Sequence, residues 1–287
     1  MSARVFDRTR NLLGEGCLWH PERGQLFWCD ILSNHVMGRM DGTLRRWTFD
    51  RQVSCLGWID RDRLFVATET DLTVLNVETD ARDHVAPLEA GMPHTRSNDG
   101  RADPQGGFWV STMGKDKATG AGALYRYYKG ELRKLKGGMS IPNTICFTPD
   151  HRYAYFSDTP AQMVMRWELG ADGWPEGKPD LWLDLRGTAW NPDGGICDAE
   201  GNVWNAQFGG ARVACYDPEG TFLHAVPIPA SQTSCPALGG PDLSTLFVTT
   251  GAVGIDEAEI SRLTGHGRTF VHETGTARGQ AEHRVIL

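Results

Sequence analysis

Residues 103–112 read DPQGGFWVST, a turn sequence with Asp, Pro and Gly that leads directly into a short apolar strand. The pattern recurs at ERGQLFWCD (22–30), DRDRLFVAT (60–68), TPDHRYAYFSDT (148–159), DAEGNVWNAQ (198–207) and GGPDLSTLFVTT (239–250). Its apolar anchors are Leu26, Leu64, Phe108, Ala154, Val203 and Leu246, at intervals of 38, 44, 46, 49 and 43 residues. Six units in 287 residues average about 48 residues each, the size of a four-stranded propeller blade.

The second half of each unit is also typical of strands. Runs such as LTVLNVE (72–78) and GALYRYYKG (122–130) have the alternating pattern of a half-buried strand. The nearest candidate for a helix is short, at residues 255–263. We therefore predict an all-β fold, a six-bladed β-propeller with a central metal site, formed by residues 1–287 as a single domain. A β-sandwich or two stacked barrels also contain many short strands, but neither leads us to expect an evenly spaced repeat.

Ring closure and composition give further expectations. Residues 5–6 and 284–287 are candidates to pair in one blade and so close the ring. The net charge of −7 argues against a nucleic-acid partner, and we expect no membrane partner because no apolar run is long enough to cross a bilayer. Seven cysteines without a CxxC motif are typical of free thiols, so we expect a cytoplasmic protein. We expect it to be a monomer or a weak dimer.

The repeat also predicts which polar residues gather near the propeller axis. The residues that lie ten or eleven positions before the six anchors are Glu15, Ser54, Asn98, Asn143, Asp193 and Cys235. Equivalent positions in successive blades are related by rotation about the axis, so these six side chains should form a ring around the central channel. Each of them should lie just before or within the innermost strand of its blade.

The oxygen-rich part of this ring suits a divalent cation. Carboxylate and amide oxygens favour Ca²⁺, Mg²⁺ or Mn²⁺, and Zn²⁺ or Fe²⁺ also accept carboxylates. The alternative without a metal site is that Asn98-Asp99-Gly100 and Pro192-Asp193-Gly194 are simply turns, because Asn, Asp and Gly tolerate left-handed backbone conformations. Only the shared spacing favours one common metal site over six unrelated polar residues.

Several longer phrases resemble a known family. They include E-G-x-x-W-H (15–20), R-x-N-D-G-R (96–101) and P-D-G-x-x-x-D-x-E-G (192–201), and matching stretches span nearly the whole chain. The chain is similar to the regucalcin and gluconolactonase family, the senescence marker proteins. That resemblance implies a six-bladed propeller that hydrolyses sugar lactones with one divalent cation.

The resemblance also assigns roles to individual residues. It implies Glu15, Asn143 and Asp193 as metal ligands, three of the six positions that the spacing selects, and Arg96 and Asn98 as substrate contacts. A further substrate residue would fall at Lys115 or Asp116, where the alignment leaves both open.

The mechanism expected from these residues is hydrolysis of a lactone whose carbonyl is polarised by the cation. Either Asp193 takes the proton of the attacking water, or a hydroxide on the cation attacks and Asp193 orients it. Arg96 would hold the sugar hydroxyls or the product carboxylate, whereas Asp99 would point away from the channel and serve a turn. A phosphotriesterase-like hydrolase and a non-catalytic cation-binding propeller are the alternatives, and the sequence names neither the sugar nor the metal.

Overall fold

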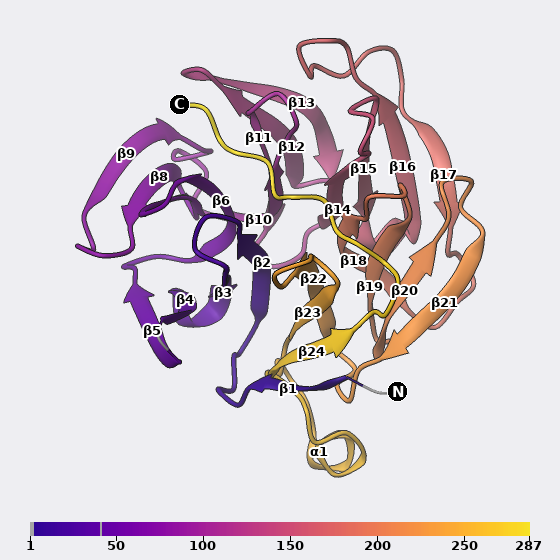
Figure 1. The fold of residues 1–287 in the computed structure, drawn as a ribbon. Coiled ribbons are helices and arrows are strands. Elements are labelled where there is room, and N and C mark those ends of the chain that lie inside the picture. The colour runs from indigo at the N-terminus through magenta and orange to yellow at the C-terminus, as the bar shows by residue number, and fades with distance from the viewer. Residues whose placement is uncertain (1–2, 41) are drawn as a thin grey trace.

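The computed structural model describes residues 3–40 and 42–287, and in these residues nearly all regular structure is β. Six antiparallel sheets of four strands each surround a central axis, which is the six-bladed β-propeller that the repeat predicts (Figure 1). The six anchors of the repeat all lie in the second strand of their sheet, at or next to its start. The turn sequence before each anchor therefore joins the innermost strand to the second strand of the same blade.

The strands follow the chain from blade to blade. Blades 1 to 3 consist of β2 (Gly14–His20), β3 (Gln25–Asp30), β4 (His35–Met40) and β5 (Thr43–Thr48); β6 (Val53–Asp60), β7 (Arg63–Thr68), β8 (Asp71–Asn76) and β9 (Arg82–Pro87); and β10 (Thr95–Ala102), β11 (Phe108–Gly114), β12 (Gly122–Tyr128) and β13 (Glu131–Met139). Blades 4 and 5 consist of β14 (Pro142–Phe147), β15 (Tyr153–Asp158), β16 (Met163–Glu168) and β17 (Asp180–Asp184), then β18 (Asn191–Cys197), β19 (Val203–Phe208), β20 (Arg212–Tyr216) and β21 (Phe222–Pro227). Blade 6 contains β22 (Thr233–Gly239), β23 (Thr245–Thr250), β24 (Thr269–Glu273) and the first strand of the chain, β1 (Arg4–Asp7). The first strand therefore completes the last blade.

Ring closure differs from the expectation at the C-terminal end. Residues 5–6 do belong to a closing strand, but β1 pairs antiparallel with β24, with Val5 opposite Phe270. The prediction that residues 284–287 pair in that blade is wrong, because Arg284 instead forms a parallel bridge with Trp58 of blade 2. The chain supplies three strands of blade 6 from one end and the fourth from the other, which leaves the last residues free to run elsewhere.

Those last residues form a segment, 278–287, which we call the C-terminal strap. It crosses the ends of several innermost strands, as Figure 1 shows in yellow. Its backbone bonds include Val285 N to Trp58 O and Ile286 N to Gly106 O, both at 2.8 Å, and its Gln280 side chain donates to Phe147 O at 3.0 Å. The predicted ring residues lie near one end of the channel. The strap covers the other end.

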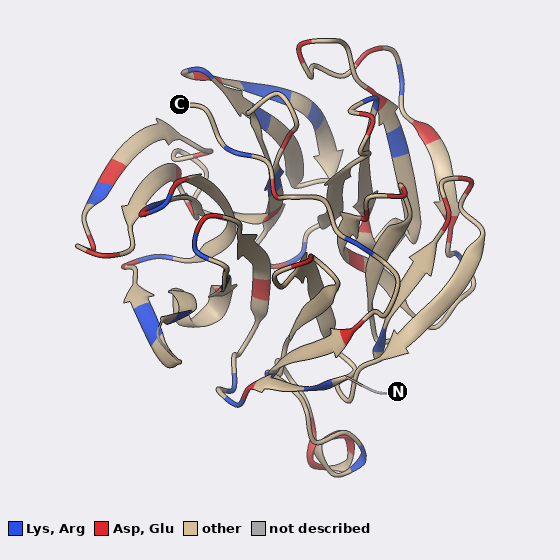
Figure 2. Ribbon diagram, viewed as in Figure 1, with Lys and Arg blue, Asp and Glu red and all other residues tan. Residues whose placement is uncertain are grey.

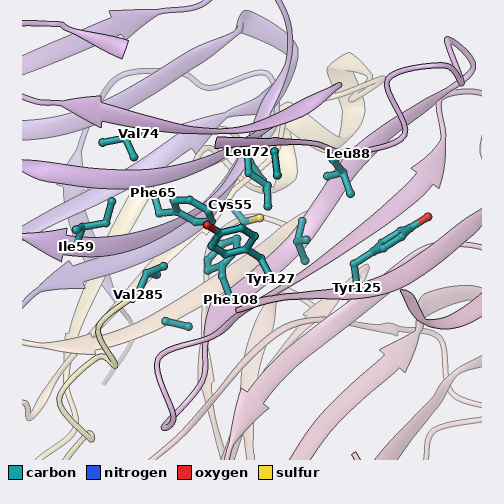
Figure 3. Packing of buried hydrophobic residues seen from close by; sticks show 14 of the residues in the cluster. Cys55, Ile59, Phe65, Leu72, Val74, Leu88, Phe108, Tyr125, Tyr127 and Val285 are labelled. Atoms are coloured by element: carbon teal, nitrogen blue, oxygen red, sulfur yellow. The ribbon is translucent and has the colours of Figure 1, made fainter. Parts of the chain in front are cut away.

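The core lies between adjacent blades, where the apolar faces of neighbouring sheets meet. In the cluster between blades 2 and 3, Phe65 and Phe108 pack edge to face with ring centroids 5.2 Å apart, and Cys55 and Tyr127 lie against them (Figure 3). Val285 of the strap enters the same cluster. Charged residues concentrate instead in turns and outer strands such as β13 (Figure 2).

Few other elements interrupt the blades in the described residues. The short helix expected at 255–263 is confirmed as α1 (Glu257–Arg262), which begins where Asp256 accepts a hydrogen bond from Glu259 N at 2.8 Å. Two 3₁₀ turns, η1 (Ile31–Ser33) and η2 (Thr159–Ala161), follow β3 and β15. No helix of the described chain has the length and apolar character to cross a membrane. All seven cysteines are free, as the sequence predicts, and all of them are buried.

Candidate active site

The innermost strand of each blade contains an irregularity at the predicted ring. In β10, Ser97 pairs with Thr112 and Gly100 with Val110, so Asn98 and Asp99 together stand opposite one residue. Comparable shifts of register occur in β2, β6, β14, β18 and β22. These are β-bulges, which bend a strand and redirect its side chains. The interpretation of 98–100 and 192–194 as turns is therefore wrong, because both stretches lie within strands.

The bulges also show that the ring residues do not all lie at the same position along their strands. Glu15 and Asn143 occupy the paired position just before their bulges, opposite Cys29 and Ser157. Asn98 and Asp193 lie one residue further along, inside their bulges. These four residues thus occupy two adjacent levels on the strands, which is why the spacing to the anchor is eleven residues for Glu15 and Asn143 and ten for Asn98 and Asp193.

Glu15 and Asp193 form a buried acidic pair. Their exposed fractions are 8% and 6%. Burial, followed by repulsion from Asp193 and Asp99, raises the pKa of Glu15 well above its ordinary value. Burial and repulsion from Asp99 likewise raise the pKa of Asp193 well above its ordinary value. Three carboxyl groups from three different blades therefore influence one another electrostatically at this end of the channel.

The two asparagine amides are held by a hydrogen-bonded chain that crosses between blades. Asn98 Nδ2 donates to Asn143 Oδ1 at 3.1 Å and to Pro142 O at 2.9 Å. Asn143 Nδ2 donates to Thr159 Oγ1 at 2.8 Å, and that hydroxyl donates in turn to Pro192 O at 2.8 Å. Because the amide nitrogen of Asn143 is engaged by Thr159, its oxygen is directed to the side on which Asn98 lies.

Arg96 supplies the positive charge of this cluster. It is 7% exposed, and its Nη1 donates to Ser97 O at 2.7 Å and to Asn98 Oδ1 at 2.9 Å. Burial lowers the pKa of Arg96 to about 10, although Glu15 and Asp193 act in the opposite direction. The guanidinium remains charged at neutral pH and is close enough to both carboxylates to interact with them.

The chemistry of these groups fits a bound divalent cation. The Glu15 carboxylate accepts a hydrogen bond from Gly16 N at 3.3 Å, and no side chain of the described residues donates to the carboxylate of Glu15 or of Asp193. Two buried carboxylates with so few donors are strongly disfavoured unless a cation compensates them. No group of three or more His, Cys, Asp or Glu side chains in residues 3–40 and 42–287 is arranged to hold a metal. A cation here would therefore need amide oxygens, such as that of Asn143, or water as additional ligands.

Lys115 and Asp116 lie apart from the hydrogen-bonded cluster. Both are exposed, in the loop between β11 and β12. Lys115 forms an ion pair with Glu69 and donates to Pro93 O at 2.9 Å, whereas Asp116 accepts from Ala118 N at 3.0 Å. The loop follows Gly114, which pairs with the residue before Arg96. It therefore starts at the same end of blade 3 as the buried arginine.

Sequence reasoning missed the groups that hold the bulges in place. Asp99 serves no turn, because its Oδ2 accepts from Ile145 N at 2.8 Å and so links blade 3 to blade 4. Thr144 Oγ1 and Asn205 Nδ2 both donate to Asp193 O, at 2.5 and 3.1 Å. The polar Asn205 within the buried strand β19 is a signal in the sequence that could have indicated such a contact, because a buried amide needs hydrogen-bond partners.

Comparison with known proteins covers almost the whole chain. Residues 13–252 match the family model described as "SMP-30/Gluconolactonase/LRE-like region". The chain is 32% identical to the L-arabinolactonase of Azospirillum brasilense, over 95% of this chain and 92% of that protein. It is 32% identical to the 6-deoxy-6-sulfogluconolactonase of Pseudomonas putida, over 85% and 84% of the two chains. The crystal structure of a calcium-binding protein, regucalcin, from Agrobacterium tumefaciens strain C58 superposes with a TM-score of 0.96 and 37% identity, covering 100% of this chain and 98% of that one.

Proposed function

The chain belongs to the SMP-30/gluconolactonase/LRE-like family, and from this membership we propose that it hydrolyses sugar lactones to the corresponding aldonic acids. The observation that carries the proposal is the buried cluster of Glu15, Asp193, Asn98, Asn143 and Arg96 at one end of the channel. Relatives that match this chain over most of its length are named for the hydrolysis of such lactones. A lactone is a cyclic ester, so the site must bind a polyhydroxylated ring and assist the attack of water on its carbonyl.

A divalent cation is the cofactor that this cluster suits. Glu15, Asn143 and Asp193 are the residues that would hold it, because two carboxylates neutralise a dication and an amide oxygen adds a hard ligand. When bound, such a cation supplies electrophilic polarisation of the substrate carbonyl. Its identity among Ca²⁺, Zn²⁺, Mn²⁺, Mg²⁺ and Fe²⁺ stays open, because oxygen ligands accept all of them.

Asp193 is the residue proposed to handle the proton of the attacking water. Burial and the charge of Asp99 raise the pKa of the Asp193 carboxyl, whereas a cation held by the same carboxylate would lower it, so Asp193 would either take the proton or orient the attacking water. The backbone carbonyl of Asp193 is fixed by hydrogen bonds from Thr144 and Asn205. The carboxylate is thus presented from a bulge whose shape the neighbouring strands hold constant, and this limits the reorganisation needed during the reaction.

Arg96 and Asn98 are the residues proposed to bind the sugar. A guanidinium has five donors in a planar fork, which suits adjacent hydroxyls or the carboxylate that forms on ring opening. Asn98 orients that fork, because its Oδ1 accepts from Arg96 Nη1 at 2.9 Å. Lys115 or Asp116 would contact the substrate only from the adjoining loop, so each is proposed as a specificity residue rather than as part of the chemistry.

The proposal is tested with a panel of aldonolactones and one phosphotriester. Each substrate is assayed with protein from which a chelator has removed metal ions, and again after each cation is added back. We expect turnover of at least one lactone and none of the phosphotriester. Asp193→Asn should abolish turnover with the fold intact, whereas the matched control Asp83→Asn should retain it because Asp83 is exposed on β9. Lactone turnover by folded, metal-free Asp193→Asn protein would remove the mechanism, and binding of cations without turnover of any substrate would favour a non-catalytic propeller.

A further inference from the structure

A cavity lies where the first and last blades meet. It is enclosed by the segment between β1 and β2 and by the connection from β23 to β24, which includes α1. Figure 2 shows basic residues in the first of these segments, beside the base of the loop that carries α1. The cavity has a volume of about 310 Å³, within the range of roughly 300–1,000 Å³ that is usual for small-molecule sites.

Three arginines line this cavity without a protein partner for their charge. The side chains of Arg8, Arg10 and Arg268 make no hydrogen bond or ion pair with any residue of 3–40 or 42–287. Most arginines of the described chain, in contrast, pair with a carboxylate, as Arg39 does with Asp7 at 2.9 Å. Arg8 and Arg10 are exposed and Arg268 is half-buried, so an anion in the cavity would meet a locally positive surface.

A buried histidine of the same cavity also lacks partners. His266 is 4% exposed, and neither of its ring nitrogens has a hydrogen-bond partner among the described residues. The nearest carboxylate is that of Glu259, 3.8 Å from His266 Nε2, and it is already bonded to Arg262 at 2.7 and 2.9 Å. Both nitrogens are covered by protein atoms, so His266 helps to form the cavity wall, and a ligand would reach its imidazole only after the ring turns toward the cavity.

The backbone holds these residues together independently of any ligand. Asn11 N and Asn11 Nδ2 both donate to Gly267 O, at 2.8 and 2.6 Å. Gly267 has a φ of +77°, and a Cβ at that position would lie 2.4 Å from Asn11 O and 2.9 Å from Arg10 Cγ. Only glycine permits this close approach, which places Arg10 next to Arg268. The cavity is therefore a built feature of the blade junction.

We propose that this cavity binds a small oxyanion, a carboxylate or a phosphate, carried by an organic molecule or free in solution. Guanidinium groups match the geometry of both anions. Ile260 and Leu263 form an apolar wall, against which the carbon skeleton of an organic acid or ester would pack. The site is separate from Glu15, Asn143 and Asp193 and does not depend on the reaction proposed for them.

The test is a calorimetric titration of metal-stripped, desalted protein with inorganic phosphate and, separately, with gluconate, at constant ionic strength. Saturable binding of at least one anion is expected. Arg10→Gln/Arg268→Gln should weaken it about tenfold, because two partly exposed charge contacts are lost. The matched control Arg46→Gln/Arg61→Gln removes the same charge outside the cavity and should leave the dissociation constant unchanged. Binding of phosphate alone would identify the ligand as a phosphate, and binding of gluconate alone as a carboxylate.

Two results would overturn the proposal: no saturable binding of either anion, or equal weakening in the cavity double variant and in the control. If Arg10→Gln/Arg268→Gln does not fold, Arg8→Gln replaces it, because Arg8 is exposed and its loss should weaken binding about threefold. Asp193→Asn should bind phosphate as tightly as the native protein. Failure of the lactonase proposal therefore leaves this site unaffected, and failure of this site leaves the lactonase proposal unaffected.

Discussion

The ion pair between Arg101 and Glu282 provides the sharpest test of how the strap seals the propeller. The two side chains are 9% and 5% exposed, and they come from β10 and from the strap. Among the described residues, the only other hydrogen bond of the Arg101 side chain is to Pro236 O at 3.4 Å, and its Nε has no partner. Burial acts to lower the pKa of Arg101, but the charge of Glu282, those of Cys235 and Asp99 and the hydrogen bond to Glu282 together raise that pKa.

Glu282→Gln removes the compensating charge and leaves a buried guanidinium. Breaking one partner of a buried pair typically costs about 3–5 kcal/mol, and in a chain of this size that lowers the melting temperature by on the order of 10 °C. Arg101→Met should cost less, because the strap can expose Glu282 by lifting locally. The double variant Arg101→Met/Glu282→Leu buries no charge, so it should be destabilised by less than the sum of the two single variants.

Equilibrium denaturation of the four proteins gives the coupling free energy directly, and proteolysis of the strap separates local release from global unfolding. The matched control is Glu273→Gln, because Glu273 pairs with Arg4 at 3.6 Å and both side chains are more than half exposed. That control should change the free energy of unfolding by less than about 1 kcal/mol. The reasoning is refuted if the free energy of unfolding of Glu282→Gln lies within about 0.5 kcal/mol of the native value and its strap is cleaved no faster than that of the native protein.

Three further variants probe buried polar groups elsewhere. Burial lowers the pKa of His20 below its ordinary value of 6.5, so the free energy of unfolding should decrease as pH falls below 6.5, and His20→Asn should show a shallower pH dependence of melting. Asp99→Ala should lower the melting temperature more than it lowers turnover per folded molecule, because Asp99 links two blades; loss of turnover in a fully stable variant would contradict this. Arg126→Met leaves the fully buried Asp103 without its charged partner at 2.6 Å and should cost about 3–5 kcal/mol by urea denaturation, and a cost below about 1 kcal/mol would show that the pair is dispensable.

The blades could be predicted because each repeats one local pattern. A turn sequence followed by an apolar strand recurs at nearly even intervals, and a repeated unit that cannot bury its faces alone must stack against copies of itself. The path of the strap could not be predicted in this way. Its contacts join Val285 to Trp58 and Gln280 to Phe147, residues far apart in the chain, and no local periodicity records such pairings.

The candidate site was accessible to the same reasoning only in part. The spacing from the anchors selected Glu15, Asn143 and Asp193, and the structure places them at the same end of the innermost strands. Their assignment as metal ligands stays a prediction. The bulges escaped notice because a bulge adds one residue to a strand without changing its composition, so the Asp-Gly and Asn-Asp-Gly sequences were equally compatible with turns.

Strand β10 shows why the two ends of the channel differ in charge. It carries Arg96 before its bulge, Asp99 within the bulge and Arg101 beyond it. Asp99 acts electrostatically on Asp193 at one end of the strand and on Arg101 at the other. Arg96 is the arginine that acts on Glu15 and Asp193, whereas Arg101 is paired with Glu282 of the strap. The two arginines of one strand therefore serve opposite ends of the channel: Arg96 belongs to the acidic cluster, and Arg101 fastens the strap.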